Sequence, residues 1–132
     1  MTQEEEKNLL LKDLCTRLPY GVRYRHFTWN DEYGETYIAA QIYSINTDGY
    51  VKNCHDDETV YIDNVRPYLF PLSSMTEEQK KEYQYITERW MNDPAYSISD
   101  SIDWLNKHHF DYRGLIEKGL ALEAPKEMYK TE

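Results

Sequence analysis

Residues 103–116, DWLNKHHFDYRGLI, gather side chains whose types could do chemistry. Within fourteen residues the segment holds two histidines, two carboxylates, three aromatic rings and an arginine. Histidine and carboxylate groups ligate metal ions and transfer protons, so the segment could be a metal-binding or catalytic site. The same residue types also suit a packed joint between two short helices.

The spacing of His108 and His109 favours the joint. Neighbouring residues on a helix point about 100° apart, so the two rings cannot chelate one metal ion as a pair four residues apart can. We predict that both histidines end one helix and that Asp111 caps the next. Three apolar residues would anchor the joint in the core: Phe110, Leu115 and Ile116. Whether His108 and Tyr112 face solvent together, and whether His109 joins them in a functional cluster, stays open.

A second group of metal-ligand types occurs in the run Cys54-His55-Asp56-Asp57. A closed zinc site needs four ligands, and only His26 and the later histidines could complete this one. We therefore predict a solvated turn, with no metal and no cofactor. The chain has no nucleophile elbow, P-loop, GxGxxG or calcium loop, which favours a protein that is not an enzyme. An enzyme or metal site using His26, His55, His108 or His109 is the third-ranked function.

Length and charge limit the class of protein. We expect residues 1–132 to form a single domain. The net charge of −9 is spread along the chain: residues 1–66 hold seven basic and twelve acidic side chains, and residues 67–132 hold eight and twelve. Proteins that bind a phosphate backbone or an anionic membrane need a positive surface. We therefore expect no direct nucleic-acid or membrane partner.

The cysteines and the N-terminus indicate a cytoplasmic location. Cys15 and Cys54 have no CxxC spacing, and Cys15 falls on the apolar side of a predicted helix, where we expect it to be buried. The N-terminus begins with acidic residues, unlike a secretory signal. No apolar stretch approaches the length of a membrane span.

The pattern of apolar residues predicts an α+β fold that begins with a helix over residues 3–18. Thr2 and Glu5 form a capping box at its start. Pro19 ends the helix and Gly21 turns the chain. The apolar face consists of Leu10, Leu11, Leu14 and Leu18.

A β-meander over residues 22–64 follows the helix. Its four strands are predicted at 22–29, 36–45, 50–53 and 59–64. The Asp-Gly pair at 48–49 marks a tight turn. Four sequential antiparallel strands suggest a small curled sheet, an SH3-like half-barrel.

The second half is predicted to be helical after an ordered connection. Two prolines in residues 65–75 argue for a connection along the sheet edge. Residues 76–124 then contain two to three helices, the first capped by Ser74 or Thr76 and the last at 112–118, ending at Gly119. Residues 125–132 are predicted to be a frayed tail.

Thirteen tyrosines make aromatic contact the best candidate function for the sheet. Tyrosine combines a large apolar ring with a polar tip, which suits a binding surface. The candidate protein-binding residues are Tyr24, Trp29, Tyr33, Tyr37, Tyr43 and Tyr50. The alternative is that the C-terminal helices cover these rings.

Three segments resemble a group of small uncharacterised proteins encoded by gut Bacteroidales and their prophages or mobile elements. The segments are LLLKDLCTRLPYGV (9–22), VRPYLFPLSSMTEEQKKE (65–82) and DWLNKHHFDYRGLIEKGLALEAPKEMY (103–129). The meander between them has no such resemblance, which suggests a shared scaffold with a different sheet. The resemblance implies an intracellular bacterial or phage accessory protein. It brings no activity and no functional residues, because the group has none assigned.

These observations rank three functions. First is a non-enzymatic protein-interaction module, an accessory protein that binds another protein through the aromatic sheet and its loops. Second is an acidic mimic of nucleic acid that inhibits a defence nuclease or another nucleic-acid-binding protein of the host. A small enzyme or metal-binding protein ranks third. The sequence is compatible with a homo-oligomer.

Overall fold

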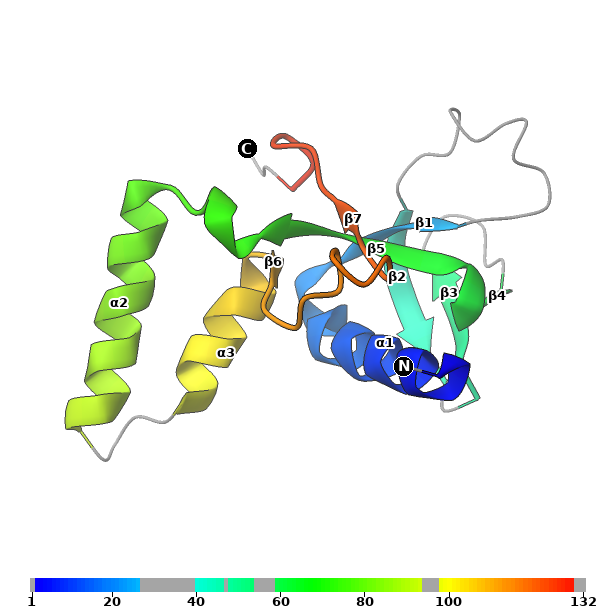
Figure 1. Cartoon of the computed structure of the whole chain (residues 1–132), viewed down its shortest axis with the longest axis horizontal. Helices are drawn as coiled ribbons and strands as arrows, with labels where there is room; N and C mark the ends of the chain where they lie inside the picture. The colour runs from blue at the N-terminus through cyan, green and yellow to red at the C-terminus, as the bar shows by residue number, and fades with distance from the viewer. Residues whose placement is uncertain (1, 27–39, 47, 54–58, 94–97, 130–132) are drawn as a thin grey trace.

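A computed structural model of the protein describes residues 2–26, 40–46, 48–53, 59–93 and 98–129. Its helices are α1 (Gln3–Arg17), α2 (Glu77–Asn92) and α3 (Ile98–Lys107). Its strands are β1 (Arg23–His26), β2 (Ala40–Ile45), β3 (Tyr50–Asn53), β4 (Thr59–Tyr61), β5 (Val65–Pro71), β6 (Phe110–Asp111) and β7 (Leu122–Glu123). Short 3-10 turns occur at Leu18–Tyr20, Ile62–Asn64 and Leu72–Ser74. The predicted α+β class, with an N-terminal helix and later helices, is confirmed (Figure 1).

The sheet is larger than the predicted four-stranded meander. Its strand order is β4-β3-β2-β1-β5-β6, and β7 also pairs with β5. Neighbouring strands from β4 to β5 run antiparallel, whereas β6 and β7 pair with β5 in parallel. The 3-10 turn after β4 returns the chain so that β5 pairs with β1.

The prediction that residues 65–75 form a connection is wrong, because residues 65–71 are a strand with neighbours on both edges. Phe70 N donates to His109 O, and Ala124 N donates to Leu69 O, each at 2.8 Å. Successive residues of a strand direct their backbone groups to opposite edges. Pro67 and Pro71 therefore share the β7 edge with Leu69. Their missing N–H groups do not interrupt the ladder to β1.

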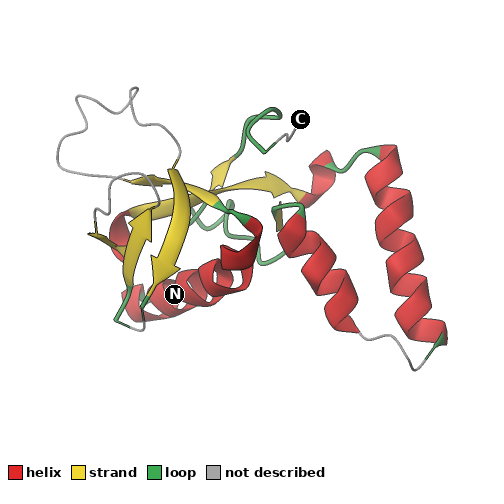
Figure 2. Ribbon diagram, turned by 180° about the vertical axis from the view of Figure 1, so that it is seen from behind, coloured by secondary structure: helices red, strands yellow, loops and turns green. Residues whose placement is uncertain are grey.

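Helix α1 covers one face of the sheet (Figure 2). Thr2 Oγ1 accepts the Glu5 backbone N–H at 3.1 Å, as the capping pattern predicts. Leu10 and Leu14 are buried against the sheet, in a core that also contains Val22, Ile42, Val51, Ile62, Val65 and Leu69. The prediction that Cys15 is buried is wrong: its side chain is exposed.

Helices α2 and α3 form a hairpin that projects from the body made by α1 and the sheet (Figure 1). Thr76 begins α2 with a complete capping box, in which its hydroxyl accepts Gln79 N at 3.1 Å and Gln79 Oε1 accepts Thr76 N at 2.9 Å. A second core joins the hairpin to the sheet. It comprises Trp104, Leu105 and Phe110, with Phe70, Met75, Tyr83, Ile86, Ile102 and Tyr112 packed against them.

The predicted helix at residues 112–118 is wrong, and so is the predicted frayed tail as far as residues 125–129 are concerned. Gly114 has φ +72°, which an α-helix excludes, so this segment forms turns. Asp111 still caps the backbone there, because its carboxylate accepts Leu115 N and Ile116 N, each at 2.9 Å. The described chain continues to Tyr129, whose hydroxyl binds the sheet backbone; residues 130–132 lie outside the described residues.

Candidate functional site

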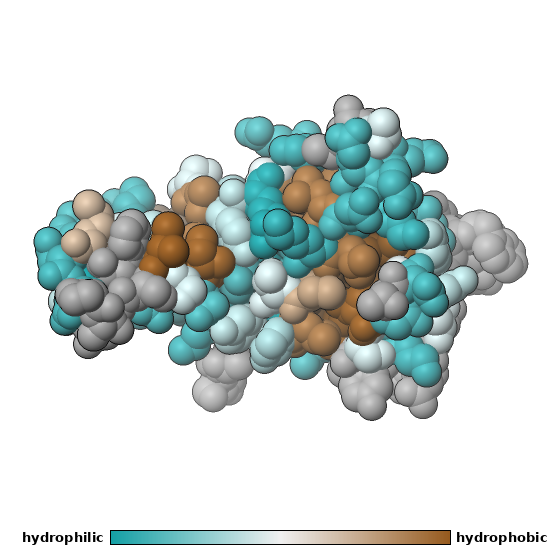
Figure 3. Space-filling model, turned by 90° about the horizontal axis from the view of Figure 1, so that it is seen from below, coloured by the Kyte–Doolittle hydropathy of each residue, from teal (hydrophilic) through white to brown (hydrophobic). Residues whose placement is uncertain are grey.

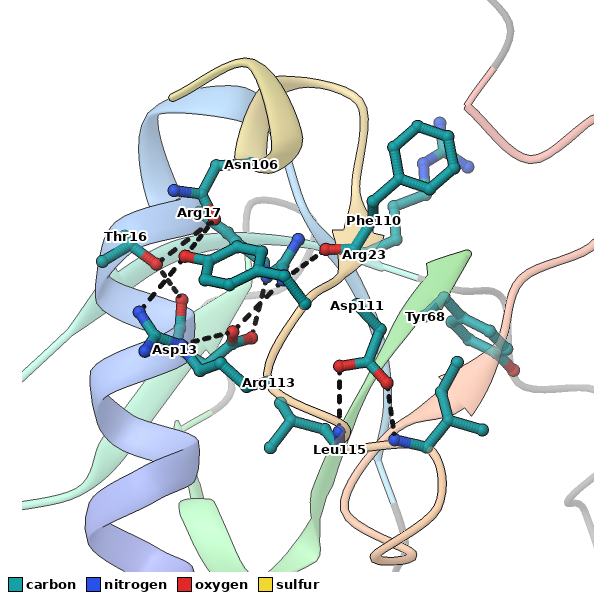
Figure 4. A network of polar contacts seen from close by, with 12 residues as sticks. Asp13, Thr16, Arg17, Arg23, Tyr68, Asn106, Phe110, Asp111, Arg113 and Leu115 are labelled. Carbon is teal, nitrogen blue, oxygen red and sulfur yellow. Dashed lines mark hydrogen bonds and ion pairs between the residues drawn. The ribbon is translucent and has the colours of Figure 1, made fainter. Parts of the chain in front are cut away.

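The segment 103–116 contributes to a buried polar joint between α1, α3 and the turn after β6 (Figure 4). Asp13 and Arg17 lie one turn apart on α1, and both side chains are 0 % exposed. Arg17 Nε donates to Asp13 Oδ2 at 2.8 Å, and Arg17 Nη2 donates to Phe110 O at 2.7 Å. Arg113 Nε donates to the other oxygen, Asp13 Oδ1, at 3.1 Å. One carboxylate therefore binds guanidinium groups from two distant parts of the chain.

Tyr112 and Asn106 extend this joint. Tyr112 Oη donates to Asn106 Oδ1 at 3.0 Å and accepts Arg113 Nη2 at 3.2 Å. The ring of Tyr112 lies beneath both guanidinium groups, 5.2 Å from that of Arg17 and 4.9 Å from that of Arg113. These contacts fix the end of α3 against α1, as a packed joint requires.

The two histidines face different surroundings. The ring of His108 lies 4.4 Å from Trp104, between centroids, and burial lowers its pKa. The ring of His109 stacks on Tyr129 with centroids 3.6 Å apart. Burial, followed by the nearby charge of Arg17, lowers the pKa of His109 to about 4. Within the part of the chain that the structure describes, no three histidine, cysteine or acidic side chains gather to hold a metal ion.

A groove of about 330 Å³ lies between the hairpin and the start of the sheet. Its apolar lining comes from three elements: Tyr20 in the first 3-10 turn, Ile86 in α2 and Trp104 in α3. Its charged lining consists of Arg89, Asp100, Asp103 and Lys107. An apolar floor with a charged margin is the usual composition of a protein-binding surface.

Neighbouring aromatic rings hold Trp104, which is part of the floor of this groove, in place. Its ring contacts Tyr83, with centroids 5.5 Å apart, and stacks on Phe110 at 5.8 Å and 12°. Only 6 % of Trp104 is exposed, and its Nε1 has no hydrogen-bond partner among the described residues. The position of the Trp104 ring in the floor is therefore fixed by its packing against Tyr83 and Phe110.

The structure places only part of the predicted aromatic surface. Tyr24 is 2 % exposed and belongs to the main core, so its assignment to a binding surface is wrong. Tyr50 is 45 % exposed, and its ring packs edge-on against Tyr61. Tyr43 lies in β2, but its side chain is outside the described set, as are Trp29, Tyr33 and Tyr37 altogether.

The groove residues were not predicted from the sequence, although a signal was present. Asp100, Asp103, Trp104 and Lys107 recur at helical spacing and so share one face of α3. Ile98, Ile102 and Leu105 also recur at helical spacing, and such an apolar stripe indicates a helix that packs on the core. Ile98 is in fact 59 % exposed.

The comparisons with known proteins give no relative. No protein-family model, no curated protein and no solved structure matches the chain. Among the described helices, none combines the length and apolarity that crossing a bilayer requires.

Proposed function

We propose that the protein is a non-enzymatic protein-interaction module that binds a partner protein through the groove between α2, α3 and Tyr20. The observation that carries this proposal is the lining itself, in which the aromatic and apolar floor of Tyr20, Ile86 and Trp104 is bordered by charged side chains. In protein interfaces a few well-packed residues contribute most of the binding energy, and Trp and Tyr are enriched among them.

A projecting hairpin is a suitable carrier for such a surface. Exposed apolar side chains stand near its free end, Met91 at 66 % and Ile98 at 59 %, and Tyr85 on α2 is 61 % exposed. Figure 3 shows apolar atoms at the surface of the hairpin and, in a larger area, over the body. Exposed apolar groups of this kind extend the area that a partner can bury.

The sheet surface remains a second part of the proposal. Tyr50 supports it, because its ring is half exposed beside Tyr61. We also propose that β1 to β5 form an SH3-like half-barrel, on the basis of the order β4-β3-β2-β1-β5 and the 3-10 turn before β5. The resemblance to Bacteroidales and prophage proteins favours a cytoplasmic accessory protein.

Quantitative capture from a bacterial lysate tests which surface acts. Three baits are compared: the wild-type chain, Ile86→Asp in the groove floor and Tyr50→Ala on the sheet. The proposal expects a protein that the wild type and Tyr50→Ala retain and Ile86→Asp loses, and that then binds the purified wild type directly. Circular dichroism and thermal unfolding verify that Ile86→Asp is folded; Tyr20→Ser replaces it if it is not. Equal retention by all three baits would refute the groove, and loss with Tyr50→Ala alone would transfer the function to the sheet.

A further inference from the structure

We infer that the groove binds a basic, amphipathic segment of the partner, with an apolar side chain over Trp104 and Ile86 and Lys or Arg side chains facing Asp100 and Asp103. The inference rests on the proposed function and specifies the chemistry of its partner. It follows from where charges stand around the floor.

The charged side chains of α3 are unevenly distributed along the helix. Asp100, Asp103, Trp104 and Lys107 occupy one face, and the three charged residues among them are exposed. Asp100 is near the free end of the hairpin, whereas Lys107 is the last residue of α3, at the body. A segment lying along this face therefore meets two carboxylates first, then the indole, then one ammonium group.

The other cation of the lining, Arg89, keeps its charge but also contacts a ring outside the groove. The guanidinium of Arg89 lies 5.4 Å from the ring centroid of Tyr85, and Tyr85 does not line the groove. Asp103 lies between Asp100 and Lys107 in the sequence of α3 and directly precedes Trp104 of the apolar floor. We therefore expect a cation of the partner to lie near Asp103.

The net charge of the whole hairpin also favours a cationic partner segment. Residues 77–107 contain seven acidic and four basic side chains, a net charge of −3, within a chain of −9. Such a field attracts cationic segments over a distance and raises their association rate. It repels phosphate backbones, and it also repels a second copy, which would bring the same net negative charge.

A designed peptide pair tests this chemistry on the full chain. The probe is LKKLLKLLKKLLKL, and the control peptide has Glu in place of every Lys. At low salt we expect measurable binding of the basic probe by calorimetry and none of the acidic peptide. Amide and indole NMR shifts should concentrate on Tyr20, Ile86 and Trp104.

Matched variants separate the groove from general charge attraction. Asp100→Asn/Asp103→Asn and Glu117→Gln/Glu123→Gln change the net charge equally, but Glu117 and Glu123 are exposed residues outside the groove. The first pair should weaken binding by about tenfold and the second by less than about twofold. Lys107→Glu should strengthen binding.

Several results would contradict the inference. Equal weakening by both pairs, NMR shifts away from the groove, or no binding of the basic probe would overturn the inference. Self-association that Asp103→Asn alters, measured by light scattering, would overturn it in favour of a second copy. If lysate capture yields a groove-dependent partner whose bound segment is acidic or neutral, this inference fails while the proposed function stands.

Discussion

The phenol ring of Tyr129 lies nearly parallel to the imidazole ring of His109, with centroids 3.6 Å apart and planes at 17°. The contact joins the C-terminal segment to His109, the second residue after α3, which adopts φ +63°. Beyond the stacked ring, the Tyr129 hydroxyl accepts Arg23 N at 2.8 Å and donates to Tyr68 O at 2.7 Å. Arg23 and Tyr68 are the next pair after Tyr24 and Pro67 in the β1–β5 register. One side chain thus bridges two strands and covers a histidine.

Acid should destabilise the protein through His109. Its pKa of about 4 in the fold is below the ordinary 6.5, so the unfolded chain binds the proton first as pH falls. The associated stability is complete above pH 6.5 and is lost between pH 6.5 and about 4, amounting to about 3 kcal/mol. Urea unfolding at pH 7, 6 and 5 should show this loss in the wild type and a smaller one in His109→Asn. Asn tolerates a positive φ. An unchanged pH dependence in the variant would contradict the assignment.

Removing the Tyr129 hydroxyl should weaken the sheet. Tyr129→Phe keeps the stacked ring but leaves Arg23 N–H and Tyr68 C=O without this partner, at a cost of about 1–3 kcal/mol. Chemical unfolding measures the loss. Tyr50→Phe is the matched control, because Tyr50 is 45 % exposed and its hydroxyl can bind water. Equal effects of the two variants would show that the bridge contributes nothing.

Removing one partner of the buried pair Asp13–Arg17 should reduce the free energy of unfolding more than replacing both partners by apolar residues. Asp13→Ala leaves the fully buried Arg17 without its carboxylate, and we expect a loss of about 3–5 kcal/mol. Asp13→Leu combined with Arg17→Met removes both charges, so its cost should be smaller than that of Asp13→Ala alone. Denaturant unfolding of the single and double variants gives both values. A double variant less stable than Asp13→Ala would contradict this account of the joint.

The capping box of α2 should stabilise the hairpin more than the sheet. Thr76→Ala removes the hydroxyl that accepts Gln79 N, and such losses cost about 1 kcal/mol. Amide hydrogen exchange should accelerate in α2 with little change in β1 to β3, since α2 packs mainly on α3. Ser73→Ala, at an exposed position just before the box, provides the comparison. Uniform acceleration in both variants would argue against local stabilisation.

Apolar periodicity and capping residues predict α1 and α2, and the Asp-Gly pair predicts the tight turn at Gly49. Each of these features depends on contacts within a few residues. Gly49 has φ +92°, and an added Cβ would lie 3.2 Å from the Lys7 side chain and 3.3 Å from that of Ile62. Both the turn and its packing therefore favour glycine. Such local requirements are visible in a single sequence.

The features that the sequence did not predict depend on contacts between residues far apart in the chain. Pro67 argued against a strand, but it forms the partner of Tyr24 at a position that needs no N–H. Asp13 and Arg17 have the spacing of an ordinary surface pair, and only Arg113 and Phe110, about a hundred residues later, make them a buried joint. The groove likewise needs Tyr20 beside Trp104. None of these contacts has a local signature.

The hairpin leaves and rejoins the sheet at one place. Phe70 in β5 pairs with Phe110 in β6, and Phe70 N donates to His109 O at 2.8 Å. The segment between these two residues therefore begins and ends at neighbouring positions of the sheet. Proteins accept insertions at sites with this arrangement. The hairpin and the body can therefore tolerate change separately, because an exchanged or shortened hairpin would leave the strand order of the sheet unchanged.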